Sequence, residues 1–168
     1  DKYGSDKPDT RYGLEFVNIS DIVADCGFKV FADSTKPGSS VRGINVVGGA
    51  DHFTRKAISH LEDHAKTYRA KGLAWMKITD EGITSPIAKF FTEEELAKIT
   101  GAMDAKSGDL LLFVADKDPV VYDALGQVRI AVADKLGLAD PNQFNLLWVT
   151  EFPIFEEDEE NGRFVAKH

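Results

Sequence analysis

Histidines at helical spacing are the first residues of this sequence that could support metal chemistry. His60 and His64 are four residues apart, and at this spacing two side chains on one helix face can chelate a metal ion. The zinc-protease pattern also requires a glutamate directly after the first histidine, but Leu61 stands there. Because Glu62 and Asp63 lie beside the histidines, we interpret this region as a solvated helix face.

An acidic run and a glycine pair are the next candidates for binding chemistry. Residues 156–160 are all Asp or Glu, and carboxylates bind divalent cations. The run lacks EF-hand spacing, however, and it precedes a predicted turn, where charge usually faces solvent. Gly48 and Gly49 could seat a phosphate, but no dinucleotide-binding or P-loop pattern follows them. A turn between a strand and a helix is therefore the better interpretation.

Nucleophilic chemistry has little support in this sequence. The single cysteine, Cys26, excludes an internal disulfide and a cysteine-based metal cluster. A lone cysteine is usually a small buried hydrophobe. The sequence contains no GxSxG nucleophile elbow. We therefore predict no metal site and no self-contained set of catalytic residues in this chain.

Composition and charge are those of an acidic globular protein. The 168 residues are 43% hydrophobic and 29% charged, which is ordinary for a folded soluble domain. The net charge of −8 argues against a general DNA or RNA coat, since such surfaces are normally basic. It leaves room for specific contact through a small basic patch. No apolar run approaches the roughly 20 residues of a membrane helix. The polar start without Met predicts a piece of a longer protein.

Hydrophobic periodicity predicts alternating strands and helices that must position any functional side chain. Alternation and apolar runs predict strands at about 11–17, 28–33, 41–49, 73–79, 108–117 and 144–152. Helical spacing predicts helices at about 18–27, 51–72, 92–100 and 118–137. Residues 80–83 are expected to form a turn, and residues 153–167 a hairpin around an Asn161-Gly162 turn.

Three helix ends carry specific signals. Thr92 with Glu95 three residues later predicts a capping box. Asp118 followed by Pro119 predicts the start of the last long helix, and Gly137 predicts its end. The two long amphipathic helices need a sheet to cover. The predicted fold is therefore α+β, in two layers, with the helices packed on one face of a mainly antiparallel sheet.

Two longer motifs resemble one enzyme family. The sequence has YGSDKPDTR at residues 3–11, and WVTEFPIFE at 148–156 followed by GRFVAKH at 162–168. In this order, with a domain between them, these motifs resemble those of bacterial aspartyl-tRNA synthetases. Thr10 and Lys167 depart from the family pattern, which often has Leu and Met there. The middle resembles the inserted GAD domain, which this family shares with the B subunit of the tRNA-dependent amidotransferase.

The resemblance implies a division of the chain into three parts. Residues 1–10 would be a flanking segment of the catalytic domain, 11–143 the inserted GAD domain, and 144–168 the re-entry strand and hairpin of the catalytic domain. His168 would match the first histidine of a pair that lies beside the aspartate pocket in the family, where it can donate hydrogen bonds to the substrate carboxylate.

The resemblance also implies the parent reaction. With ATP and Mg²⁺, the family activates aspartate and transfers it to the 3′ end of tRNA. The parent would be a cytoplasmic homodimer, with no membrane or DNA partner. The class II motifs that hold ATP are absent from this sequence. We therefore expect the chain itself to be inactive.

Three roles remain open for the chain. In the first, it tunes the approach of tRNA, and the most plausible phosphate contacts are the basic residues of the long helix and its end: Arg55, Lys56, Lys66, Arg69 and Lys71. In the second, it is a structural brace for the rest of the synthetase and should expose an apolar patch. In the third, it is the amidotransferase subunit, although the motif at 148–156 argues for the synthetase.

Overall fold

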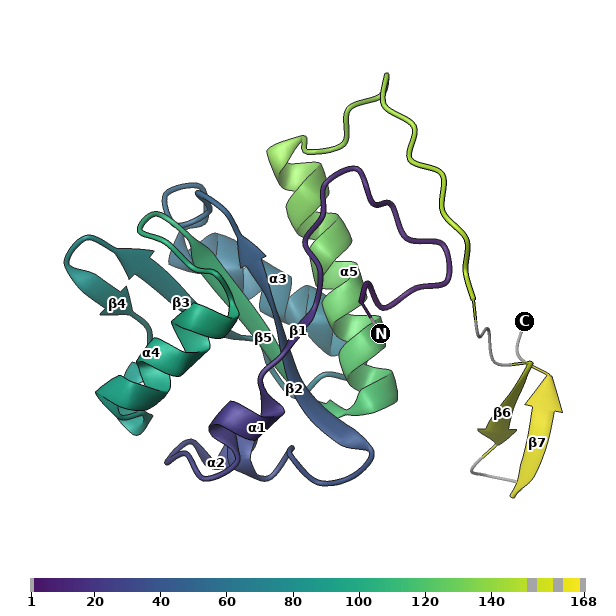
Figure 1. The fold of residues 1–168 in the computed structure, drawn as a ribbon, viewed down its shortest axis with the longest axis horizontal. Coiled ribbons are helices and arrows are strands. Elements are labelled where there is room, and N and C mark those ends of the chain that lie inside the picture. The colour runs from purple at the N-terminus through teal and green to yellow at the C-terminus, as the bar shows by residue number, and fades with distance from the viewer. Residues whose placement is uncertain (1, 151–153, 159–161, 167–168) are drawn as a thin grey trace.

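One antiparallel sheet organises most of this computed structural model, which describes residues 2–150, 154–158 and 162–166. The sheet has five strands in the order β1-β2-β5-β3-β4 (Figure 1). A separate hairpin of β6 (Phe155–Asp158) and β7 (Arg163–Ala166) follows near the C-terminus. This confirms the hairpin prediction. Asn161 of its predicted turn lies outside the described residues, and Gly162 has the left-handed φ of 59°.

Two long strands form the centre of the sheet. β2 (Ser39–Val46) and β5 (Leu110–Lys117) pair along their whole length, from Ser39 opposite Lys117 to Val46 opposite Leu110. Five consecutive residues of β5, Leu110–Val114, are buried. Because successive side chains of a strand point to opposite faces, such a run is buried only when both faces of the sheet are covered.

Shorter strands complete the two edges. β1 (Val17–Asn18) pairs with β2, and β3 (Ala74–Thr79) pairs with the other side of β5. β4 (Gly82–Thr84) folds back on β3 as a hairpin, where the sequence predicted only a turn. The predicted strands at 41–49, 73–79 and 108–117 are confirmed, with small shifts at their ends.

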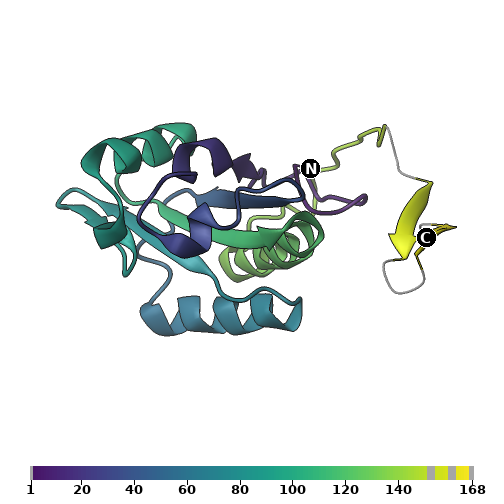
Figure 2. The same ribbon diagram turned by 90° about the horizontal axis from the view of Figure 1, so that it is seen from below.

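Helices cover the sheet on both faces (Figure 2). The described residues form α1 (Ser20–Val23), α2 (Lys29–Ala32), α3 (Arg55–Thr67), α4 (Glu93–Ala102) and α5 (Asp118–Leu136). α3 and α5 pack with Leu110, Leu112 and Val114 of β5. The other three helices pack with Leu111 and Phe113. The α+β class and the antiparallel sheet are confirmed, but the helices lie on two faces instead of one, because β5 is apolar on both.

The helix-end signals have mixed outcomes. Thr92 and Glu95 form the predicted capping box at the start of α4. Gly137 ends α5 in the left-handed conformation, with φ of 62°, as predicted. Asp118, however, is already inside α5 and does not cap it. Its carboxylate accepts a hydrogen bond from the Ser40 hydroxyl at 2.6 Å, so it ties the helix start to β2.

The strand prediction at 11–17 holds only for Val17, which begins β1, and the one at 28–33 is wrong. Gly13 and Leu14 have φ of 60° and 52°, and the carbonyls that would pair with a neighbouring strand accept hydrogen bonds from Arg129 instead. Residues 29–32 form the short helix α2. Phe28 and Phe31, three residues apart, pack against each other at 5.0 Å between ring centroids, and a helical turn is what brings such a pair together.

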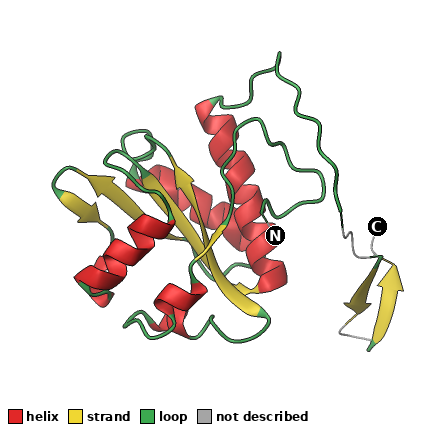
Figure 3. Ribbon diagram, viewed as in Figure 1, coloured by secondary structure: helices red, strands yellow, loops and turns green. Residues whose placement is uncertain are grey.

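The predicted strand at 144–152 is also not formed in the structure. Residues 144–150 are exposed and have no pairing partner among the described residues, and residues 151–152 lie outside them. Figure 3 shows this segment as an extended loop after α5. A strand requires hydrogen bonds to a neighbour, so apolar alternation alone did not form one here.

Asp109 is a buried carboxylate that fixes the start of β5. Its side chain is buried and accepts hydrogen bonds from the backbone N–H of Gly48 at 2.8 Å, the backbone N–H of Lys106 at 2.9 Å and the Asn45 amide at 3.1 Å. Burial acts to raise the pKa of Asp109, but these hydrogen bonds outweigh it and hold the pKa below its ordinary value.

We predict that Asp109→Asn lowers the free energy of unfolding by about 1–3 kcal/mol at pH 7, since an amide cannot accept all three hydrogen bonds. The carboxylate stabilises the fold above the unfolded-state pKa of about 3.9, and this contribution is lost as the pH falls through the lower folded-state pKa. Urea denaturation from pH 7 to about pH 3 should show the gap to wild type closing. Asp51→Asn, at an exposed turn residue, is the control. A gap that is constant with pH would contradict the assignment.

Candidate functional site

Arg129 of α5 is the central polar residue of the structure. Only 2% of its surface is exposed. Its Nη2 donates to the carbonyl oxygens of Asp9 at 2.5 Å and Gly13 at 2.6 Å, and its Nε donates to that of Leu14 at 3.1 Å. We call residues 2–16 the incoming segment. Arg129 therefore binds the incoming segment to α5 through the backbone.

Aromatic faces supply the rest of the environment of Arg129. The guanidinium carbon lies 4.4 Å from the ring centroid of Tyr12 and 4.8 Å from that of Tyr3. Among the described residues no carboxylate forms an ion pair with it. Burial lowers the pKa of Arg129, but a guanidinium stays charged at neutral pH. Carbonyl dipoles and ring quadrupoles therefore compensate the buried charge.

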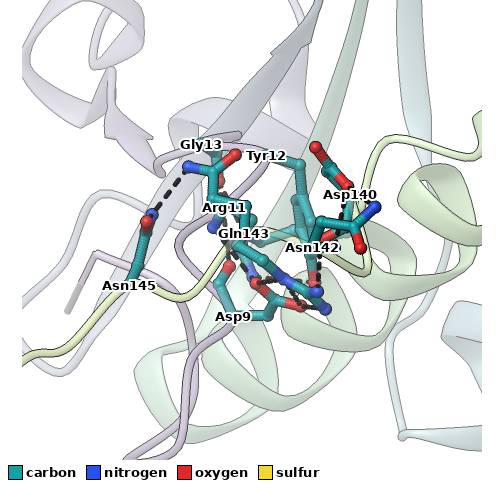
Figure 4. A network of polar contacts seen from close by, with 9 residues as sticks. Asp9, Arg11, Tyr12, Gly13, Asp140, Asn142, Gln143 and Asn145 are labelled. Carbon is teal, nitrogen blue, oxygen red and sulfur yellow. Dashed lines mark hydrogen bonds and ion pairs between the residues drawn. The ribbon is translucent and has the colours of Figure 1, made fainter.

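Arg11 connects the incoming segment to the chain that leaves α5. Its Nη2 lies 2.6 Å from Oδ2 of Asp9, and its Nη1 donates to the carbonyl oxygen of Asp140 at 2.7 Å (Figure 4). The hydrogen bond from Arg11 holds the pKa of Asp9 below its ordinary value. We call residues 138–150 the outgoing segment. The two segments are thus held side by side at the end of α5.

Gly4 allows the incoming segment to approach α5 closely. It has φ of +71°, and a Cβ at this position would lie 2.1 Å from the carbonyl oxygen of Tyr122. Any other residue would therefore be strained and would also clash with the helix backbone. The first motif that carried the family resemblance, residues 3–11, includes Gly4, Asp9 and Arg11, so much of it serves to pack and fasten this segment.

The five predicted tRNA contacts do not form one cluster. Arg55 and Lys56 lie at the first turn of α3 and are exposed. The other three residues lie at its far end or beyond, and each faces a carboxylate: Lys66 with Glu62 at 2.8 Å, Arg69 with Asp123 at 3.1 Å, and Lys71 with Asp116 at 3.9 Å. Part of the predicted positive surface is therefore neutralised locally, and contact with tRNA stays a prediction.

The other site predictions concern His168, Cys26, metal binding and membrane spans. His168, the predicted aspartate-pocket residue, lies outside the described residues. Cys26 is buried as predicted, and burial raises the pKa of its thiol. Over the described ranges no three His, Cys, Asp or Glu side chains converge as a metal site would require. No helix in this part of the chain combines the length and apolar character of a membrane span.

The outgoing segment and the hairpin expose a row of large apolar side chains. The exposed fractions reach 86% at Phe144, 99% at Leu146 and 94% at Trp148, and Phe164 of β7 is 75% exposed. Single exposed hydrophobic residues are normal, but several large ones within so short a stretch are the kind of apolar surface that a partner would cover. This is the feature that the structural-brace hypothesis predicted.

Sequence analysis did not identify Arg129. Arg129 belongs to the buried face of α5, whose other residues, such as Val128 and Val132, are mostly apolar. A charged residue on a buried stripe is rare unless it is paired. This was the available signal that a partner segment must cover it.

We predict that Arg129→Lys lowers the free energy of unfolding by about 2–4 kcal/mol, because an ammonium cannot reproduce the planar fork that reaches three carbonyls. Hydrogen exchange in residues 2–16 should accelerate in the same variant. Chemical denaturation and amide exchange measure the two effects. Arg69→Lys, at a position with an exposed ion pair, should cost less than about 0.5 kcal/mol. Equal effects of the two substitutions would contradict the role of Arg129.

Comparison with known proteins places these features in a family. The profile of the GAD domain matches residues 31–125, inside the predicted range of 11–143, whose outer limits stay a prediction. The chain is 53% identical over 167 residues to the aspartate–tRNA(Asp/Asn) ligase of Anoxybacillus flavithermus. The matched region covers 99% of this chain and 28% of that protein. It is 54% identical over 169 residues to the aspartate–tRNA ligase of Ruminiclostridium cellulolyticum, with 100% and 28% covered.

These matches confirm the resemblance seen in the two motifs. The aspartate–tRNA ligase of Clostridium perfringens is likewise 54% identical over the whole chain. The chain spans 28% of the length of these relatives. Because the domain profile covers more than half of its residues, this chain belongs to the GAD domain family.

Proposed function

We propose that this chain is the part of an aspartate–tRNA ligase that carries the inserted GAD domain, and that it positions tRNA instead of performing chemistry. The parent would use ATP and Mg²⁺ to activate aspartate in the cytoplasm, as a homodimer. The single observation that carries the proposal is the likeness to aspartate–tRNA ligases over the whole chain. The absence of the class II ATP-binding motifs from the sequence supports the non-catalytic role.

The fastening of the two segments supports a positioning role. An inserted domain is joined to its parent by two chain crossings. Here Arg129 fastens the incoming segment to α5, and Arg11 ties that segment to Asp140 of the outgoing segment. Two adjacent crossings that are tied together restrict rotation far more than one flexible linker would. The domain would thus keep a fixed direction at the rim of the active site, where the acceptor end of tRNA must arrive.

A second candidate function is a structural brace for the catalytic domain. The exposed apolar side chains of the outgoing segment and hairpin favour it, because they would be covered by the rest of the parent. The amidotransferase alternative has less support, since the relatives compared above are aspartate–tRNA ligases.

Excision of the domain from the parent separates the two candidates. The ends are close, because the Arg11 side chain reaches the Asp140 carbonyl at 2.7 Å. A short Gly-Ser linker can therefore replace residues 12–139, so that Arg11 and Asp140 are retained and residues 140–168 stay in place. We predict that aspartate-dependent ATP–pyrophosphate exchange stays within about threefold of wild type, while kcat/KM for tRNA falls about tenfold, or about 1.4 kcal/mol.

The outcomes are distinct. Loss of the exchange reaction together with aspartylation would favour the brace over the positioning role. Unchanged aspartylation would contradict both. The parent with the domain intact but carrying Asp51→Asn, at an exposed turn residue, is a control for surface changes. The 168-residue chain alone should show no aspartate-dependent exchange, and turnover by it would overturn the non-catalytic assignment.

A further inference from the structure

A shallow groove lies between α3 and α5. Its volume is about 420 Å³. In Figure 2 the two helices run together on the same face of the sheet. The groove is lined by Thr54, Lys56, Ala57, His60, Leu61, His64, Ala131 and Lys135. None of these lining residues is acidic, in a chain whose net charge is −8.

The polar residues of the groove form a row. Lys56, His60 and His64 are successive i, i+4 positions and therefore share one face of α3. Each step advances about 6 Å along the helix axis. Lys135 faces this row from α5, with its ammonium 5.5 Å from the ring centroid of Phe53. α3 thus supplies a row of three polar side chains along one wall, and α5 supplies Lys135 on the other.

The two lysines of the groove have no carboxylate partner among the described residues. Within the described part of the chain, neither Lys56 nor Lys135 forms an ion pair, whereas Lys66, Arg69 and Lys71 each do. Both groove lysines are exposed. The other residues of the lining include the small or apolar side chains of Ala57, Leu61 and Ala131.

We propose that this groove binds the phosphodiester backbone of an RNA strand, through ammonium groups of Lys56 and Lys135 and ring N–H groups of His60 and His64. A row of donors suits successive phosphates of one strand, and such contacts position a nucleic acid without reading its sequence. This inference rests on the proposed function, in which the RNA is tRNA. Of the five basic residues predicted from the sequence, it retains Lys56, excludes the three that face carboxylates, and does not use Arg55, which does not line the groove.

Binding of an RNA hairpin tests the groove directly. The probe is a fluorescent minihelix with an acceptor-type stem and a single-stranded CCA end, and fluorescence anisotropy is measured with the 168-residue chain at low salt. Lys56→Gln combined with Lys135→Gln should weaken binding about tenfold. It should also reduce the slope of log affinity against log salt by about 1.4–1.8, because two phosphate contacts are lost.

The matched control is Lys66→Gln combined with Arg69→Gln, which removes the same charge outside the groove. It should weaken binding less than threefold. Equal losses in the two double variants would overturn the proposal in favour of general electrostatics, and so would absence of binding by the wild-type chain at low salt. Circular dichroism melting of each variant verifies that the fold is retained.

Assays on variants of the parent enzyme distinguish a failure of the groove proposal from a failure of the proposed function. There, Lys56→Gln with Lys135→Gln should raise KM for tRNA severalfold and leave aspartate-dependent pyrophosphate exchange unchanged. If the domain-excised parent loses tRNA efficiency but the groove variant does not, the groove assignment fails while the proposed function stands. If neither variant changes aspartylation, both fail.

Discussion

The buried guanidinium of Arg129 is the interaction on which the connection of this domain depends. A charge taken out of water must be compensated, and no carboxylate does so among the described residues. Instead the incoming segment curls over α5 and turns three backbone carbonyls and two aromatic rings toward the charge. The irregular conformation of residues 9–14 follows from this requirement, since their carbonyls have no strand partner.

This arrangement has a mechanical consequence. Backbone carbonyls do not depend on side-chain identity, so Arg129 holds the path of the chain and leaves the side chains of the segment free to pack. Arg11 then extends the connection to Asp140, which follows the domain in the sequence but lies next to Arg11 in space. A domain inserted into a larger protein needs both crossings near each other, and here two arginines provide that proximity.

The sheet and the helices were largely predictable because their signals are local. The continuous apolar run of β5, the capping box at Thr92 and the glycine at 137 each act within a few residues. The strand predictions for residues 11–16 and 28–33 fail for a common reason. An alternating pattern shows which side chains prefer burial, but it does not show whether a neighbouring strand, a helix or an arginine will satisfy the backbone.

The sequence by itself determined the class of the fold, the acidic character of the chain and, through two motifs, its family. Only the tertiary structure decided that helices cover both faces of the sheet, that Arg129 lies under the incoming segment, and which basic residues remain unpaired. The physical reason is that charge compensation and backbone pairing depend on partners distant in sequence. Lys56 and Lys71 look alike in the sequence, but the fold places Asp116 near only Lys71 and brings Lys135 across the groove from Lys56.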